Sequence, residues 1–244
     1  ASTTYTIDQP TSYLAPALGI TLGRLLRCNF LQIFILGRLF NLIAYVWLAY
    51  LAIKTAPCCK QLMLMISIIP MAMHQAASLS YDVIVNGGSL VLFAYILKIL
   101  SEKKPFSWMN VLVCTFILVL FGQVKVVYCI LAMLVLLIPA EQFRSRKDRI
   151  LKTACIFCGD AGALFAARLP AIVSHVVGTE YGTRMDFYNM TFVFQYPVRF
   201  LRLILSSFET YFWMFAKQSI GISLAGLNIS IAEYLVIAFM IVLA

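Results

Sequence analysis

The chain has 244 residues, of which 62% are hydrophobic and only 12% charged, and its formal net charge is +9. A soluble domain is about 45–50% apolar and about 25% charged, so this composition excludes an ordinary soluble domain. The positive charge does not indicate nucleic-acid binding, because the lysines and arginines lie in short loops between apolar runs, where they orient helices in a membrane. The composition therefore predicts a polytopic membrane protein whose main partner is the lipid bilayer.

Apolar runs long enough to cross a bilayer, about 17–25 residues each, recur along the sequence. They predict an all-α, polytopic transmembrane helical bundle that forms one domain over residues 1–244. We expect about seven membrane or half-membrane helices and one further amphipathic helix. Both ends look cut, since the chain starts without methionine and stops inside an apolar run. We expect a fragment of a longer protein, with at least one span before Ala1.

The first helix expected along the chain is "SYLAPALGITLGRLLR", residues 12–27, an amphipathic helix lying on the outer membrane surface. Apolar segments then follow one another. The expected spans are 31–53, 61–77 with Pro70 as a kink, and 83–100; after them come two short runs, 109–122 and 126–139, that form a thin hairpin, and a long run, 150–175. A polar stretch, 176–199, leads to an amphipathic segment, 199–217, a hinge, and a last apolar run from about residue 229.

Lysine and arginine positions predict the orientation of the bundle. Alternating spans put three basic loops on one side of the membrane, and the positive-inside rule makes that side cytoplasmic. These loops contain Lys54 and Lys60; Lys98, Lys103 and Lys104; and Arg144, Arg146, Lys147, Arg149 and Lys152. The segments "SLSYD", "GQVK" and 176–199 are then expected to face outward.

The stretch "PMAMHQAASLSYD", residues 70–82, ends an apolar run with a cluster of polar side chains. On one continuous helix, Gln75, Ser78 and Asp82 recur at i, i+3 and i+7 and share a face, beside Tyr81. Two interpretations are open for Asp82. It caps the next helix, or the whole cluster lines a substrate cavity, since polar groups in membranes usually face a bundle interior.

Other charged residues within or beside the apolar runs are further candidates. Arg38 lies three residues before Asn41 in the first span, and Asp160 lies eight residues before Arg168, too far for a direct pair on one helix. Lys125 and Tyr128 mark the outward hinge of the short hairpin, where the lysine either binds an anionic ligand or reaches lipid phosphates. Arg184 belongs to the aromatic-rich outer stretch, which suits a binding loop or an aromatic belt.

The cysteines and histidines do not form a metal-binding pattern. Cys155 and Cys158 have a redox spacing, but they fall in an expected membrane helix, where small apolar residues are common. We expect no metal and no cofactor, with a divalent ion left open.

Several pieces of the sequence together resemble one family. They are "SYLAPALG", Gly37-Arg38-x-x-Asn41, Pro70-Met71, Gln75-Ala-Ala-Ser78 and Ser80-Tyr81-Asp82, with a looser fit at Lys125, Tyr128 and Gly221. The family is a bacterial multi-pass membrane family known as domain of unknown function 2142. It looks like the GT-C glycosyltransferases, which use polyprenyl-phosphate sugars at the outer membrane face.

The resemblance implies an outer-face glycosyltransferase in the bacterial plasma membrane. Its partners would be a lipid-linked sugar donor and a cell-envelope glycan acceptor. In such enzymes a carboxylate of the first outer loop commonly acts as general base; here Asp82 and Asp8 are candidates, and the base itself is expected to lie upstream of Ala1. The expected substrate-binding residues are Arg38, Gln75, Ser78, Tyr81, Asp82, Lys125, Tyr128 and Arg184. The alternative is a carrier or flippase for a lipid-linked or polar substrate.

Overall fold

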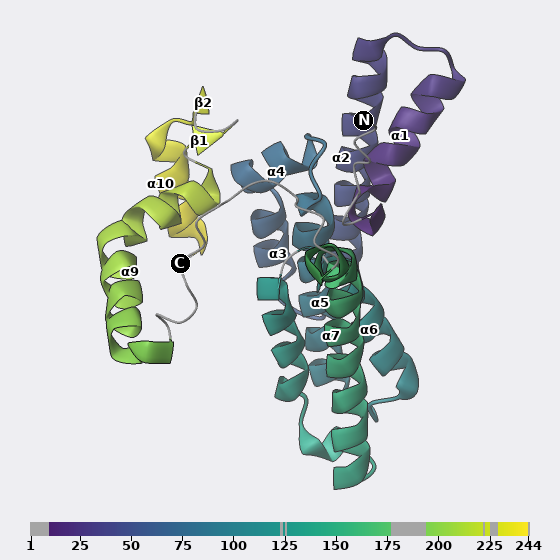
Figure 1. Cartoon of the computed structure of the whole chain (residues 1–244), viewed down its shortest axis with the longest axis vertical. Coiled ribbons are helices and arrows are strands. Elements are labelled where there is room, and N and C mark those ends of the chain that lie inside the picture. The colour runs from purple at the N-terminus through teal and green to yellow at the C-terminus, as the bar shows by residue number, and fades with distance from the viewer. Residues whose placement is uncertain are drawn as a thin grey trace. The chain divides into compact units, whose positions relative to one another are not determined.

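The structure of the chain, a computed structural model, describes residues 10–122, 124, 126–176, 194–221, 223–224 and 229–243. Contacts divide the chain into two compact units, Ala1–Ile172 and Val173–Ala244, and each is described by itself. The expected all-α class is confirmed, because helices make up almost all of the described chain (Figure 1). The expectation of one domain stays a prediction.

The first unit is a bundle of helices of unequal length. In chain order its elements are the 3₁₀ helix η1 (Pro10–Tyr13), α1 (Leu14–Leu25), α2 (Phe30–Thr55), α3 (Lys60–Ser67), α4 (Pro70–Ala76), α5 (Asp82–Glu102), α6 (Trp108–Gly122), the 3₁₀ helices η2 (Val126–Leu137) and η3 (Ala140–Gln142), and α7 (Arg146–Val176), whose last residues lie in the second unit.

Three helices of the described chain are long and apolar enough to cross a membrane: Phe30–Thr55, Asp82–Glu102 and Arg146–Ala167. The expected short hairpin also forms, since α6 contacts η2. At 1.5 Å per residue the 15 residues of α6 are about 22 Å long, and at 2.0 Å per residue the 12 residues of η2 are about 24 Å long. The 3₁₀ winding therefore lets the shorter run match its neighbour in length.

The expected second span, 61–77, is not one helix. The chain breaks at Ile68 and Ile69, so that α3 and α4 are separate short helices. Ile69 has φ −52° and ψ 132°, an extended ψ, because the ring of a following proline disfavours the helical conformation. Pro70 also lacks the N–H that a continuous helix would need, and it instead starts α4. The consequence is that Gln75 and Asp82 do not share a helical face.

Helix α1 forms a hairpin with the first half of α2 (Figure 1). The helix expected at 12–27 is therefore present, but it packs along α2. The turn is fixed by Asn29, whose side chain accepts from the Gln32 N–H while the Gln32 side chain accepts from the Asn29 N–H. Gly19 and Gly23 bring the two backbones together, because any Cβ at Gly19 would collide with the Leu36 carbonyl oxygen.

We expect Gly19→Ala to destabilise the protein by about 1–3 kcal/mol, the usual cost of overpacking a close contact. Thermal unfolding of the purified protein in detergent measures it. Gly162→Ala is the matched control: a Cβ there meets nothing within 4 Å, so the exchange should be neutral or stabilise α7 by up to about 1 kcal/mol. Equal effects of the two substitutions would contradict the close α1–α2 contact.

Helices α2 and α5 pack side by side and run in the same direction. Asn41 contacts the segment just before α5, Leu48 packs on Gly87, and Ala52 clusters with Ala94. Small residues allow this close approach, as is typical of helix pairs in membranes. The pair α3 and α4 returns the chain between them.

The two ends of this unit differ in chemistry. At one end, called the basic end, the C-terminal ends of α2 and α5 and the start of α7 carry the three lysine- and arginine-rich loops. The Gln142 amide donates to the Ile99 carbonyl at 3.1 Å, and the Phe106 N–H donates to the Gln142 carbonyl at 2.7 Å. These bonds join the α5–α6 and η3–α7 connections. At the opposite end of α5 lies the connection between α4 and α5.

The second unit consists of α9 (Pro197–Ile220), the short strands β1 (Ser223–Leu224) and β2 (Ile229–Ser230), and α10 (Glu233–Leu243). The strands pair antiparallel, Ser223 opposite Ser230 and Leu224 opposite Ile229. Helix α9 ends at Gly221, whose φ of 112° is left-handed and suits glycine. It contacts α10, and the two helices line an open apolar groove with Trp213, Lys217 and Ile237.

Candidate functional site

The candidate site is the connection of residues 77–81, called here the polar turn, which joins α4 to α5. Three of its backbone carbonyls, those of Ala77, Ser78 and Ser80, accept hydrogen bonds from side chains of α2. The Nε of Arg38 donates to the Ala77 carbonyl, and the Nδ2 of Asn41 donates to the carbonyls of Ser78 and Ser80 at 2.7 and 3.0 Å. Buried backbone acceptors need such partners, so α2 fixes the shape of the polar turn.

Asn41 is the most enclosed polar side chain at this site, with 1% of its surface exposed. Its Nδ2 has two acceptors, whereas its Oδ1 has no hydrogen-bond partner among the residues that the structure describes. Asn41 was expected beside Arg38 in the first span, but it was not among the expected substrate-binding residues. An asparagine in an apolar span, three residues after an arginine, is the sequence feature that could have identified it as a site residue.

Asp82 is the first residue of α5, and Ser80 holds it. The Ser80 hydroxyl donates to Oδ2 of Asp82 at 2.6 Å and accepts from the Asp82 N–H at 3.1 Å. The N-cap position belongs to Tyr81, and no side chain caps the helix there. Asp82 is therefore not the N-cap, although a carboxylate in the first turn still interacts favourably with the positive end of the helix.

Gln75, in α4, bonds both to the polar turn and to α5. The Ser78 hydroxyl donates to the Gln75 carbonyl at 2.7 Å, and the Gln75 side-chain oxygen accepts from Asn86 of α5 at 2.9 Å. Asn86, like Ser80, was not assigned to the site from sequence. The two amides link α4 directly to α5, so they fix the two helices on either end of the polar turn relative to each other.

Two tyrosines complete the site. The rings of Tyr13 and Tyr81 meet edge to face with centroids 6.1 Å apart. Burial raises the pKa of the Tyr13 phenol, and the proximity of Tyr81 and Asp82 raises it further. The phenol is therefore neutral at physiological pH, and η1 brings an aromatic ring next to the carboxylate of Asp82.

The structure thus brings together most of the expected site residues, though not by the expected helical face. Arg38, Gln75, Ser78, Tyr81 and Asp82 gather around the polar turn from α2, α4 and α5. Tyr128 packs half-buried on the core of α5, α6 and η2. Asp8, Lys125 and Arg184 lie outside the described residues.

The chemistry of this arrangement is that of a polar binding surface at the end of a helix bundle. It offers a carboxylate that accepts hydrogen bonds or a proton, a guanidinium with five donors, of which Nε is engaged by Ala77, and several amides and hydroxyls. Within the described ranges, no three His, Cys, Asp or Glu side chains gather as metal ligands do.

Comparison with known proteins identifies one family. The family model described as "Predicted membrane protein (DUF2142)" matches residues 1–244. No curated protein and no solved structure matches the chain. The family resemblance is therefore confirmed over the whole sequence, whereas the likeness to GT-C glycosyltransferases stays a prediction.

Proposed function

We propose that the chain, which belongs to the DUF2142 family of predicted membrane proteins, is part of a glycosyltransferase-like membrane protein. It would take a sugar from a polyprenyl-phosphate donor at the outer face of the bacterial plasma membrane and pass it to a cell-envelope glycan. The observation that carries this proposal is the polar turn, where Asp82 and Arg38 are held by fixed hydrogen bonds at the end of a candidate span.

The two charged side chains suit different parts of such a reaction. A carboxylate can take the proton of an acceptor hydroxyl as that oxygen attacks the sugar, and Asp82 is the carboxylate of the polar turn. The Arg38 guanidinium matches a phosphate in geometry and charge. Arg38 is exposed, and its contact with Ala77 orients it without burying it.

The proposed side of the membrane follows from the distribution of charge. Three basic loops lie at the end of the bundle away from the polar turn, and such loops are normally cytoplasmic. Helix α5 separates the polar turn from the basic end by 21 residues, about 32 Å, which is enough to cross the hydrocarbon core of a bilayer. The polar turn then faces outward, where the donor phosphate would lie in the outer leaflet.

One observation favours the carrier. The break between α3 and α4 leaves a discontinuous helix, and transporters often bind substrates at such breaks near the membrane midplane. The polar side chains described above, however, gather at one end of α5 and not around the break at Ile68 and Ile69. That placement supports the transferase over the carrier.

The experiment uses the full-length protein in lipid nanodiscs with a short-chain polyprenyl-phosphate sugar as probe. Arg38→Gln should weaken donor binding by roughly 10–100-fold, the value of a charge-assisted hydrogen bond. Arg38→Lys should lose less, because it keeps the charge. Arg24→Gln, at the exposed end of α1, is the matched control and should bind as the wild type does.

Binding that Arg38→Gln leaves unchanged would contradict the proposed donor site. Sidedness is checked on the same protein in intact cells, with all native cysteines replaced. An impermeant thiol reagent should label a cysteine placed at Ser80 and should not label one placed at Lys103. The reverse pattern would put the polar turn on the cytoplasmic side and rule out an outer-leaflet donor.

A further inference from the structure

Helix α7 carries a carboxylate in the middle of its length. Asp160 is fourteen residues, about 21 Å, from the start of the helix at Arg146, inside the candidate span Arg146–Ala167. Only 2% of Asp160 is exposed. This distance from the basic end places the carboxyl group within the apolar layer, because the hydrocarbon core of a bilayer is about 30 Å thick.

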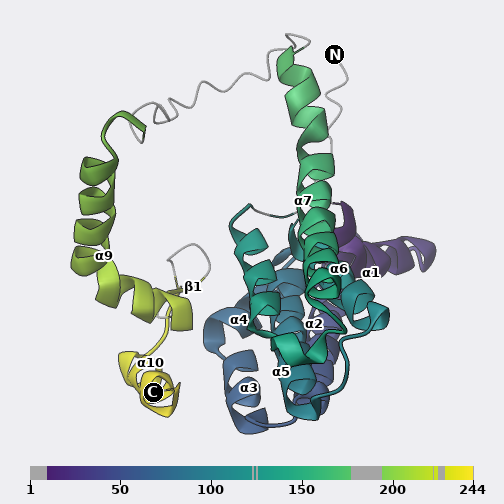
Figure 2. The same ribbon diagram turned by 90° about the horizontal axis from the view of Figure 1, so that it is seen from below.

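Two other elements bring polar side chains close to this part of α7. Helices α6 and α7 lie side by side in both views (Figures 1 and 2), and Gly159 lets Thr115 of α6 pack directly against α7, since a Cβ at Gly159 would collide with the Thr115 methyl group. Cys129, from η2, lies close enough to the Asp160 carboxyl to interact with it electrostatically. Helix α6 and η2 therefore both approach α7 at the level of Asp160.

Two oxygen atoms of this cluster lack a hydrogen bond. Oδ1 of Asp160 and Oγ1 of Thr115 are both inaccessible, and neither has a partner in the described part of the chain. Buried polar atoms are nearly always paired, and the cost of leaving one unpaired is larger in hydrocarbon, where water cannot substitute.

Among the side chains that the structure describes, no charged group neutralises this cluster. Lys152, about 12 Å away along α7, is bonded to Asp148 and to the Phe106 carbonyl. Arg168 is equally far in the other direction along the axis, and its side chain lies outside the description. Helix α6 presents the neutral Thr115, and η2 presents Cys129, the titratable group that faces the carboxyl. An ionised carboxylate in such surroundings is more costly than a neutral one.

We propose that Asp160, Thr115 and Cys129 form an intramembrane proton-binding site, in which the Asp160 carboxyl group holds a proton taken from water. A protonated carboxyl has an O–H donor and no net charge. It thereby removes the buried charge from the apolar layer. The proposal is independent of the sugar transfer proposed above, because it concerns the interior of α6, η2 and α7 and not the polar turn.

Infrared spectroscopy of the full chain in lipid nanodiscs tests the proposal. A protonated carboxylic acid has a carbonyl-stretch band separate from the bands of carboxylates, and the wild type should show it at pH 7. An exposed aspartate, with a pKa of about 3.9, is ionised at that pH. Asp160→Asn should remove the band. Glu141→Gln, at an exposed position of η3, is the matched control and should keep it.

Other outcomes decide against the proposal. Absence of the band in the wild type at pH 7 would show an ionised Asp160, and loss of the band on adding Na⁺ would replace the proton by a metal cation. A band that survives Asp160→Asn would belong to another group. Thr115→Val should shift the frequency of the band, because it replaces a polar side chain packed against Gly159 by an apolar one. This wild-type measurement stands even if Asp160→Asn does not fold.

Discussion

Asp82→Asn in the full-length protein should lower the rate of sugar transfer by about 10²–10⁴-fold, the usual contribution of a general base. Asparagine has the shape of aspartate and keeps an oxygen that can accept from the Ser80 hydroxyl, which bonds to Asp82 at 2.6 Å. The substitution removes the ability to take a proton. The measurement is the initial rate of transfer from a short-chain polyprenyl-phosphate sugar, with the enzyme saturated in donor.

Two controls separate catalysis from folding in this experiment. Loss of the carboxylate from the first turn of α5 costs about 0.3–1 kcal/mol through the helix dipole, so the midpoint of thermal unfolding should fall only slightly. Donor binding should also stay close to that of the wild type, because Arg38 is unchanged. Full transfer activity in a folded Asp82→Asn variant would show that Asp82 only stabilises the start of α5. The general base would then be another residue.

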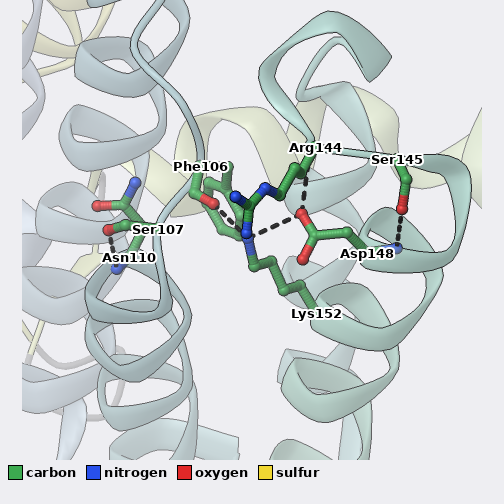
Figure 3. A network of polar contacts seen from close by, with 7 residues as sticks. All are labelled: Phe106, Ser107, Asn110, Arg144, Ser145, Asp148 and Lys152. Carbon is green, nitrogen blue, oxygen red and sulfur yellow. Dashed lines mark hydrogen bonds and ion pairs between the residues drawn. The ribbon is translucent and has the colours of Figure 1, made fainter.

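Lys152→Met should destabilise the first unit by about 3 kcal/mol, the lower end of the range for breaking a buried ion pair. Lys152 is 7% exposed, and its Nζ donates to the Phe106 carbonyl at 2.6 Å and to Asp148 Oδ2 at 2.8 Å (Figure 3). Methionine fills similar space but cannot donate a hydrogen bond. The Phe106 carbonyl and Asp148 Oδ2 therefore both lose the bond from Lys152. We expect a loss at the lower end of this range for two reasons. The Asp148 side chain is 19% exposed, and its Oδ2, which accepts a hydrogen bond from the Arg144 N–H at 3.2 Å, keeps that bond in the variant.

The matched control is Lys104→Met at the same end of the bundle. Lys104 pairs with Glu102 at 3.0 Å, but 76% of its side chain is exposed, and exposed ion pairs contribute about 0–1 kcal/mol. Chemical or thermal unfolding in detergent measures both variants. A double variant, Lys152→Met with Asp148→Leu, should regain part of the lost stability, since it removes the unpaired carboxylate. Equal losses for Lys152→Met and Lys104→Met would contradict the burial of this network.

Sequence patterns alone predict that this protein lies in a lipid bilayer, and they locate its long helices. The apolar runs expected at 31–53 and 83–100 are α2, Phe30–Thr55, and α5, Asp82–Glu102. This succeeds because the length of an apolar run reports the thickness of the lipid layer that it has to cross, and neighbouring helices do not alter that requirement. The basic loops can also be located from the sequence, because their charges stay outside the apolar layer.

Which polar groups contact one another follows from the packing of the helices and is not predicted by the sequence. Arg38 bonds to Ala77, Asn41 to Ser80, and Lys152 to Phe106, and each pair is separated by 39 or 46 residues. Such contacts depend on how the helices pack against one another, and the periodicity of the sequence does not contain that information. The shared face expected for Gln75 and Asp82 was wrong for the same reason, because Pro70 divides the span into two helices. The turn that follows leaves carbonyls outside the helical pattern, and side chains of α2, packed alongside, donate to three of them.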